Sequence, residues 1–263
     1  MTRRRWKGLT ALTIDRNNII AHLKTTLAPL PFFHALWLEG ADANGTADQY
    51  SDIDFWVDIE DDCETQAYEA VEGALAALAP LDYQYNMRHG HPKIRQRIYH
   101  LAGTSEYLMI DFCWQLHSRE AYCFTENDSI EAAKVLFDKS GVIQFQPFNA
   151  ADFTDENRQR LEKAIYRRSQ QTRAEKYVRR GLYAEAYAYY NRYALEPLID
   201  LLRLIYTPAH ADYHLVHISQ HIPKAELDRL EYFAQTGSLQ DIAERLPKAA
   251  QWFDILLETI PGL

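Results

Sequence analysis

Residues 38–54 decide the fold and read LEGADANGTADQYSDID, a stretch with two glycines and two closely spaced aspartates at its end. Apolar residues at 33–38 predict a strand that ends at the first glycine, and residues 52–59 predict a second strand. Side chains alternate between the two faces of a strand. Asp52 and Asp54 are therefore expected on one face, while the apolar residues between and after them enter the core.

Two carboxylates on one strand face repel each other, and one of them keeps its proton unless a cation compensates. Mg²⁺ prefers oxygen ligands and takes its remaining ligands from water and phosphate. The same ion can bridge triphosphate oxygens and stabilise a leaving pyrophosphate. Backbone N–H groups of the glycine turn can bind phosphate oxygens, and Gly40 lets the backbone come close. The pattern indicates a Mg²⁺ site that faces a nucleoside triphosphate.

This stretch resembles the nucleotidyltransferase superfamily typified by DNA polymerase β, and within it the branch that modifies aminoglycoside and lincosamide antibiotics. That family carries a Gly-Ser turn and, after a loop of similar length, a Ser-Asp-x-Asp strand. The residues that match are Gly40, Gly45, Ser51, Asp52 and Asp54. Ala41 replaces the turn serine, which removes a hydroxyl contact to phosphate and leaves the backbone donor. The resemblance implies that Asp52 and Asp54 are catalytic metal ligands and that Gly40, Ala41 and Ser51 contact the nucleotide.

The resemblance covers residues 33–114 and implies a third carboxylate on a later strand. Asp111 is the only acidic residue in the apolar segment 107–114. In the family this position either completes the metal site or acts as general base toward the substrate hydroxyl, and both roles stay open. A cation from the helical half often reaches the triphosphate in such enzymes, and Lys176 is assigned this role.

The rest of the chain predicts an α+β fold in two domains. Residues 15–27 and 64–78 have helical spacing. Further strands are expected at residues 83–87, 94–101 and 106–114, and two more strand pieces at 135–138 and 142–145 around a turn at 139–141. Residues 1–148 are thus predicted to form a nucleotidyltransferase catalytic domain, a small mixed sheet flanked by helices.

Residues 149–263 are predicted to form a helical bundle that binds the substrate. Leu, Ala, Arg and Tyr dominate there, and strong helix breakers are few. The expected helices are a long one from residue 155 to about residue 180, another at 182–205, and shorter ones at 213–220, 224–236 and 239–260.

Composition favours a cytoplasmic protein. Acidic residues outnumber basic ones by 37 to 28, a formal charge of −9, which argues against nucleic acid as a partner. The three cysteines show no ligand-like pairing and no disulfide framework is expected. No apolar run is long enough to cross a bilayer, so no membrane partner is expected, and the basic segment 1–7 is a poor signal peptide. The acidic run at 58–62 is interpreted as a solvated loop.

Two other motifs suggest other kinds of site, a P-loop and a zinc site. Gly40 and Gly45 have the spacing of a P-loop, but Thr46 stands where that motif needs lysine, so the P-loop is rejected. The four histidines at intervals of four, three and four would share one face of a continuous helix and could bind zinc; they are His210, His214, His217 and His221. Because no Cys or acidic ligand completes that set, a partly buried polar stripe is the favoured interpretation.

The resulting functional expectation is a Mg²⁺-dependent adenylyltransferase-like enzyme. It would transfer AMP from ATP, or a nucleoside monophosphate from another triphosphate, to a hydroxyl of a small molecule and release pyrophosphate. The resemblance implies an aminoglycoside or lincosamide antibiotic as acceptor, and hence antibiotic resistance. Two alternatives are kept: nucleotidylation of a protein or RNA, and a non-catalytic, antitoxin-like interaction protein of the same fold. The oligomeric state is not predicted.

Overall fold

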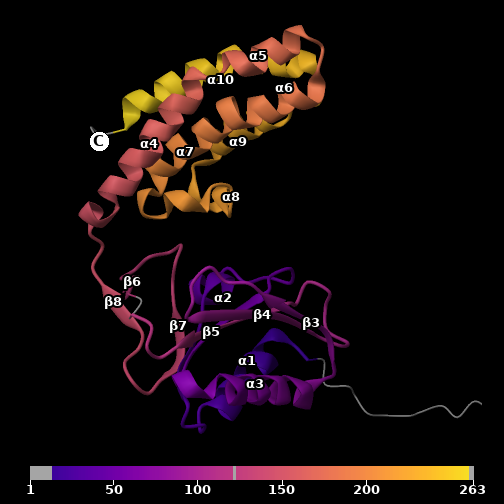
Figure 1. Ribbon diagram of the computed structural model, residues 1–263, viewed down its shortest axis with the longest axis vertical. Helices are drawn as coiled ribbons and strands as arrows, with labels where there is room; N and C mark the ends of the chain where they lie inside the picture. The colour runs from indigo at the N-terminus through magenta and orange to yellow at the C-terminus, as the bar shows by residue number, and fades with distance from the viewer. Residues whose placement is uncertain (1–13, 121–122, 261–263) are drawn as a thin grey trace, which may run out of the picture. The chain divides into compact units, whose positions relative to one another are not determined.

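The structure of the protein is a computed structural model that describes residues 14–120 and 123–260 (Figure 1). The chain divides into two compact units, Met1–Phe148 and Asn149–Leu263. The basic segment 1–7, interpreted above as a poor signal peptide, lies outside the described residues. The architecture is the expected α+β fold, with strands in the first unit and helices alone in the described part of the second.

A six-stranded mixed sheet forms the first unit, in the order β3-β4-β5-β2-β1-β7. Its strands are β1 (Phe33–Leu38), β2 (Ile53–Ile59), β3 (Leu81–Met87), β4 (Ile94–Leu101), β5 (Ile110–Leu116) and β7 (Lys134–Asp138). Only the central pair β2 and β5 is parallel among these strands; the other neighbours run antiparallel. The connection from β2 to β5 passes through a helix and two strands, as a parallel pair requires.

Two helices, α1 (Arg16–Leu27) and α3 (Glu64–Leu78), cover one face of this sheet (Figure 1). Helix α1 begins where Asp15 caps it, because the Asp15 side chain accepts from the backbone N–H of Asn18 at 2.8 Å. The buried face combines alternate strand residues with one stripe of each helix. Strand alternation therefore leaves Asp54, Trp56 and Asp58 of β2 on the opposite face.

That opposite face carries short elements: α2 (Gly40–Asn44), β6 (Cys123–Thr125) and β8 (Gln144–Gln146). The short helix η1 (Asp61–Cys63) follows β2 in the chain. The two strand pieces expected around residues 139–141 are present as β7 and β8, but they do not pair with each other, since β8 pairs in parallel with β6 in a separate sheet. The Asp138 carboxylate accepts from the backbone N–H groups of Val142 and Ile143, which turns the chain away from β7. The strand expected at 106–114 begins only at Ile110, because a turn closed by Leu108 N–H to Ser105 precedes it.

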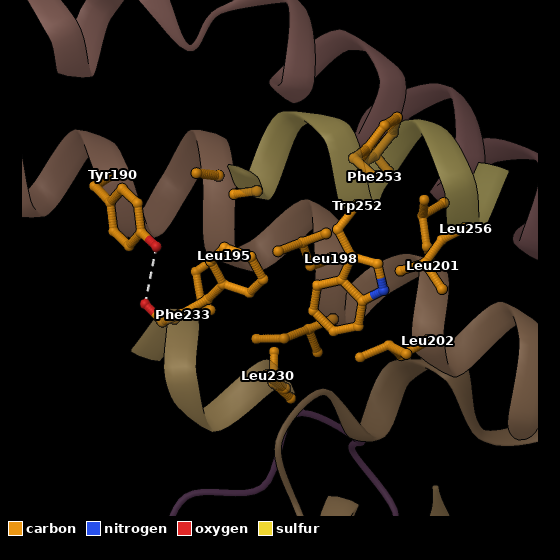
Figure 2. Packing of buried hydrophobic residues seen from close by; sticks show 14 of the residues in the cluster. Tyr190, Leu195, Leu198, Leu201, Leu202, Leu230, Phe233, Trp252, Phe253 and Leu256 are labelled. Atoms are coloured by element: carbon orange, nitrogen blue, oxygen red, sulfur yellow. Dashed lines mark hydrogen bonds between the residues drawn. The ribbon is translucent and has the colours of Figure 1, made fainter. Parts of the chain in front are cut away.

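The second unit is helical. Its elements are η2 (Ala150–Phe153), α4 (Thr154–Ser169), α5 (Thr172–Arg179), α6 (Tyr183–Tyr190), η3 (Asn191–Leu195), α7 (Glu196–Tyr206), η4 (Pro208–Tyr213), α8 (Ile218–His221), α9 (Lys224–Ala234) and α10 (Leu239–Thr259). Figure 2 shows their core, where Trp252 of α10 lies among leucines of α7 and α9. The Trp252 ring stacks on Phe233 with centroids 5.3 Å apart. The buried Tyr190 hydroxyl donates to the Phe233 carbonyl at 2.9 Å.

Two long helices expected in this unit are interrupted. Hydrogen bonds from Gln170 N–H to Arg167 and from Gln171 N–H to Arg168 close a tight turn between α4 and α5. No Gly or Pro marks this break in the sequence. Between α6 and α7 the chain forms the π-helical turn η3 just before Pro197. Proline has no N–H to continue the α-helical ladder, and a π turn relieves this local mismatch.

None of the described helices combines the length and apolarity that crossing a bilayer requires. The three cysteines, Cys63, Cys113 and Cys123, are free thiols.

Candidate functional site

Asp54 and Asp111 lie directly opposite each other on the parallel strands β2 and β5. Neighbouring strands are about 4.8 Å apart, so their side chains are adjacent on the sheet face that the core does not use. Asp52 precedes the first residue of β2 by one position. The predicted carboxylates, separated by up to 59 residues in sequence, therefore belong to one small region of the fold.

The pKa of Asp54 reflects the nearby carboxylates. Its pKa is raised to about 7, mainly by burial and also by the charges of Asp52, Asp111 and Asp42, while Arg16 lowers it. Burial also raises the pKa of Asp111, which the charge of Asp52 raises as well. Several carboxylates thus share a partly buried region with one arginine nearby, an environment that a divalent cation would stabilise.

Gly40 stands directly against this carboxylate. Its φ of +58° is the left-handed conformation that favours glycine, and a side chain there would overlap Asp54 Oδ2. The backbone N–H of Glu39 also donates to the Asp54 carbonyl at 3.0 Å. The glycine turn is therefore adjacent to the aspartates, as the sequence predicts, and a larger residue would displace Asp54.

Arg16 of α1 fixes the loop that leads into β2. Its guanidinium pairs with the Asp42 carboxylate, donates to the Ser51 carbonyl, and donates to the Asp52 carbonyl at 2.8 Å. Burial raises the pKa of Asp42, and the Arg16 charge lowers it. One side chain thus ties α1, α2 and the start of β2 together, which orients Asp52 through its backbone.

Gln96 of β4 holds Asp111 from the neighbouring strand. Its amide nitrogen lies 2.9 Å and 2.8 Å from the two carboxylate oxygens of Asp111. This hydrogen bond lowers the pKa of Asp111 against the larger effect of burial. The orientation of the Asp111 carboxylate is consequently set by protein contacts.

A small hollow of about 100 Å³ lies on the same sheet face as Asp54, lined by Trp37, Glu39, Trp56, Arg119 and Glu131. The two indoles stack with centroids 5.9 Å apart. The Trp37 indole N–H donates to Glu39 at 2.9 Å. The pKa of Glu39 is raised to about 7, mainly by burial and in part by the Asp54 charge. The Arg119 guanidinium lies 5.8 Å from the Trp56 ring centroid, so the two carboxylates and the stacked indoles of this hollow already face one cation.

The residues assigned to the nucleotide have different surroundings. Ser51 uses its hydroxyl in the loop, donating to Asp48 Oδ1 at 3.0 Å and accepting from the Asp48 backbone N–H. The Ala41 carbonyl accepts from the N–H groups of Thr46 and Ala47, which closes α2. Lys176 belongs to α5 in the second unit, with its ammonium 5.3 Å from the Tyr177 ring centroid. Their contacts to a nucleotide stay predictions.

The histidine series does not form a shared face. His214 and His217 have positive φ values of 49° and 52°, so no helix runs through them. The buried Arg203 accounts for this shape, because it donates to the carbonyls of His214 and Val216 at 2.7 Å and 2.5 Å. A continuous helix would have used those carbonyls internally. Among the described residues, none of the four histidines joins a group of three potential metal ligands.

Asp58 corrects the interpretation of the acidic run as solvated. It is buried on β2 with 1% of its surface exposed. Gln115 donates to its Oδ2 at 2.7 Å, and His117 Nδ1 lies 2.6 Å from its Oδ1. Among the described residues, one group of three potential metal ligands has its ligand atoms within 4.8 Å of one another: His34, Asp58 and His117. The aspartate trio is more widely spaced than that.

Three functional candidates were missed by sequence reasoning: Arg16, Glu39 and Gln96. Arg16 precedes Asp52 by 36 residues, and nothing in its local sequence distinguishes it from other surface cations. Gln96 is polar in an alternating strand, which is ordinary for a strand with a solvated face. Of these three residues, only Glu39 could have been found from the sequence, because it is an acidic residue between an apolar strand and the glycine turn of the predicted site.

No family model matches the chain, and no curated protein matches it. Among solved structures, an aminoglycoside 6-adenyltransferase from Bacillus subtilis is similar with a TM-score of 0.31 and 12% sequence identity, over 92% of each chain. A likeness at that level does not establish a shared family.

Proposed function

We propose that the protein is a Mg²⁺-dependent nucleotidyltransferase that moves AMP from ATP to a hydroxyl of a small molecule and releases pyrophosphate. The observation that carries the proposal is the pairing of Asp54 with Asp111 across β2 and β5, beside Gly40 and two residues beyond Asp52. This arrangement brings together oxygen ligands and a close-approaching backbone turn, as binding of Mg²⁺ and triphosphate requires.

Asp52 and Asp54 would hold the cation. Mg²⁺ in such sites uses one or two carboxylates together with substrate phosphates, so two aspartates suffice despite the wider spacing of the trio. When bound, the ion supplies Lewis acidity to the α-phosphate and charge compensation to the leaving pyrophosphate. Arg16 would keep Asp52 in position through its backbone carbonyl, and Gly40 would leave room for the carboxylate of Asp54.

Asp111 would either bind the metal as well or accept the proton of the acceptor hydroxyl. Its raised pKa and its fixed orientation by Gln96 suit a general base. The Asp111→Asn variant separates the two roles. Loss of a base flattens the acidic limb of the kcat profile against pH and leaves Mg²⁺ affinity unchanged, whereas loss of a ligand raises the Mg²⁺ concentration needed for half-maximal rate.

The acceptor is proposed to carry a cationic group. The hollow beside Trp37 and Trp56 supports this, because its two carboxylates outnumber its one cation, Arg119, and its stacked indoles favour an ammonium. An aminoglycoside has such groups, and a lincosamide carries one amine. In this proposal, Glu39→Gln raises KM for the acceptor and leaves KM for ATP within twofold.

The decisive experiment is release of labelled pyrophosphate from each nucleoside triphosphate with Mg²⁺, with and without a panel of aminoglycosides and lincosamides. Turnover that requires one of these acceptors, and that yields a product heavier by AMP in mass spectrometry, would support the proposal. Asp54→Asn should lower kcat at least about 1,000-fold, as loss of a main electrostatic contributor does.

Exposed Asp62 provides the matched control, because it lies just after β2 but outside the site. Asp62→Asn should retain the wild-type rate. Wild-type turnover by Asp54→Asn would refute the site. Labelling of protein or RNA in place of a small molecule would refute the acceptor class, and failure of the chain to bind any nucleotide would refute the activity.

A further inference from the structure

A second group of potential metal ligands lies toward the other end of β2 from Asp54. His34, Asp58 and His117 each present one ligand atom, and these atoms lie within 4.8 Å of one another. The imidazoles of His34 and His117 stack with centroids 3.9 Å apart and planes inclined by 21°. Three potential ligands from three separate chain segments therefore share one small volume.

A β-bulge accounts for the presence of His34 in this group. The register between β1 and β2 shifts between Phe33 and Ala35, so Phe33 pairs with Ile59 and Ala35 pairs with Asp58. His34 is the extra residue of the bulge. Phe33 packs in the main core while Ala35 packs on the opposite face, where Asp58 also lies. Bulges re-aim side chains in this way, and they are frequent next to functional sites.

The other two ligands are fixed by the end of β5. The His117 backbone N–H donates to the Ile59 carbonyl at 2.8 Å, which places its ring beside the carboxyl end of β2. Asp58 is buried, and Gln115 donates to its Oδ2 at 2.7 Å, leaving Oδ1 directed at His117 Nδ1, 2.6 Å away. The Asp58 carboxylate is thus oriented by a neighbour that is not itself a ligand.

A similar contact orients His34. Its Nδ1 lies 3.0 Å from the Ser140 hydroxyl, and its Nε2 lies 3.2 Å from Glu60 Oε2. Metal-binding histidines usually use the second ring nitrogen in such a hydrogen bond, which fixes the tautomer and aims the ligating nitrogen. Glu60 adds a carboxylate that is 54% exposed and can swing toward the same volume.

We propose that His34, Asp58 and His117 bind a divalent transition-metal ion of the Zn²⁺ class, with Glu60 as fourth ligand. Two imidazoles and carboxylate oxygens are the donors that Zn²⁺ takes at about 2.0–2.2 Å in tetrahedral sites, whereas Mg²⁺ prefers oxygen alone. The ion cross-links the start of β1, the end of β2 and the segment after β5. This site is separate from the aspartates of the proposed activity and does not depend on that activity.

Titration of the full-length, chelator-treated protein with Co²⁺ in excess Mg²⁺ tests this proposal. Cobalt(II) bound by nitrogen and oxygen ligands gives visible absorption bands, and calorimetry gives the stoichiometry. We expect one Co²⁺ per chain, displaced by Zn²⁺. Because His117 is 41% exposed, His117→Gln should preserve the fold, and it should weaken binding by at least about tenfold, as should His34→Gln.

His100→Gln is the matched control. His100 also lies 2.6 Å from a carboxylate, that of Asp82, but has no second histidine beside it. It should bind Co²⁺ like the wild type, as should Asp54→Asn, which separates this site from the one proposed for Mg²⁺. Absence of Co²⁺ binding to the folded wild type, or binding unchanged in both His34→Gln and His117→Gln, would overturn the proposal.

Discussion

Replacing Asp54 by Asn should stabilise the metal-free protein at neutral and alkaline pH while it abolishes turnover. The carboxylate is partly buried among Asp52, Asp111 and Asp42, and its pKa is raised from 3.8 to about 7. An acid whose pKa is raised by folding binds its proton more tightly in the folded state. Stability is therefore lost as pH rises from about 4 to about 7, when the folded group must ionise.

The size of the effect follows from the same pKa. The difference between 3.8 and about 7, at about 1.4 kcal/mol per pH unit, gives about 4 kcal/mol as the upper limit of the cost of ionising Asp54 in the folded chain. Asparagine has nearly the same shape and carries no charge at any pH. The free energy of unfolding of Asp54→Asn should thus match that of the wild type near pH 4 and exceed it by up to about 4 kcal/mol at pH 8.

Urea unfolding followed by tryptophan fluorescence at pH 4.5, 6 and 8, with EDTA present, measures this difference. Adding Mg²⁺ at pH 8 should stabilise the wild type, because a bound cation compensates the carboxylates, and should stabilise the variant less. Asp62→Asn should change the free energy by less than about 0.5 kcal/mol at every pH, since it is exposed. A variant less stable than the wild type at pH 8 would show that the Asp54 charge is already compensated, and the electrostatic reasoning would fail.

Four further substitutions test local geometry. Gly40→Ala should cost more than about 1 kcal/mol of stability because of its positive φ, and it should also abolish turnover by displacing Asp54. Gly45→Ala, with φ of +78° and open space around its Cβ, should lose stability but keep activity. Unfolding curves and pyrophosphate release distinguish the two variants. Tyr190→Phe should destabilise the second unit by about 1–3 kcal/mol, because a buried carbonyl of α9 loses its donor, and equal stability by urea unfolding would contradict this. Arg203→Lys should destabilise that unit by a similar amount, because a lysine cannot reproduce the bonds of the guanidinium to two loop carbonyls; unchanged protection of the 208–221 segment in hydrogen exchange would refute that.

Local pattern was sufficient for the elements around the aspartates. The strands β1 and β4 and the helix α3 begin and end at the predicted residues, because apolar periodicity and flanking breakers are local properties of the chain. Strand alternation predicts a shared face for Asp52 and Asp54, but β2 begins at Ile53, one residue after Asp52. The proximity of Asp111 was an inference from family resemblance, since no local signal tells which strand will pair with β2.

Long-range partners were decided by the tertiary structure. Arg16 and Gln96 contact the aspartates only because α1 and β4 pack where they do. Asp58 looked like part of a solvated acidic run, yet two partners from the end of β5 allow its burial. The loop at 214–217 takes its shape from Arg203 on another helix, which competes for carbonyls that helical periodicity would have paired.

The sequence by itself determined where the chain extends, where it coils and which strand carries the acidic pair, because those features depend on neighbours within a few residues. The tertiary structure alone decided that β5 lies parallel to β2, and that a bulge brings His34 beside Asp58 and His117. Register and bulges are set by how a whole sheet fills its core, and no stretch of a few residues contains that information.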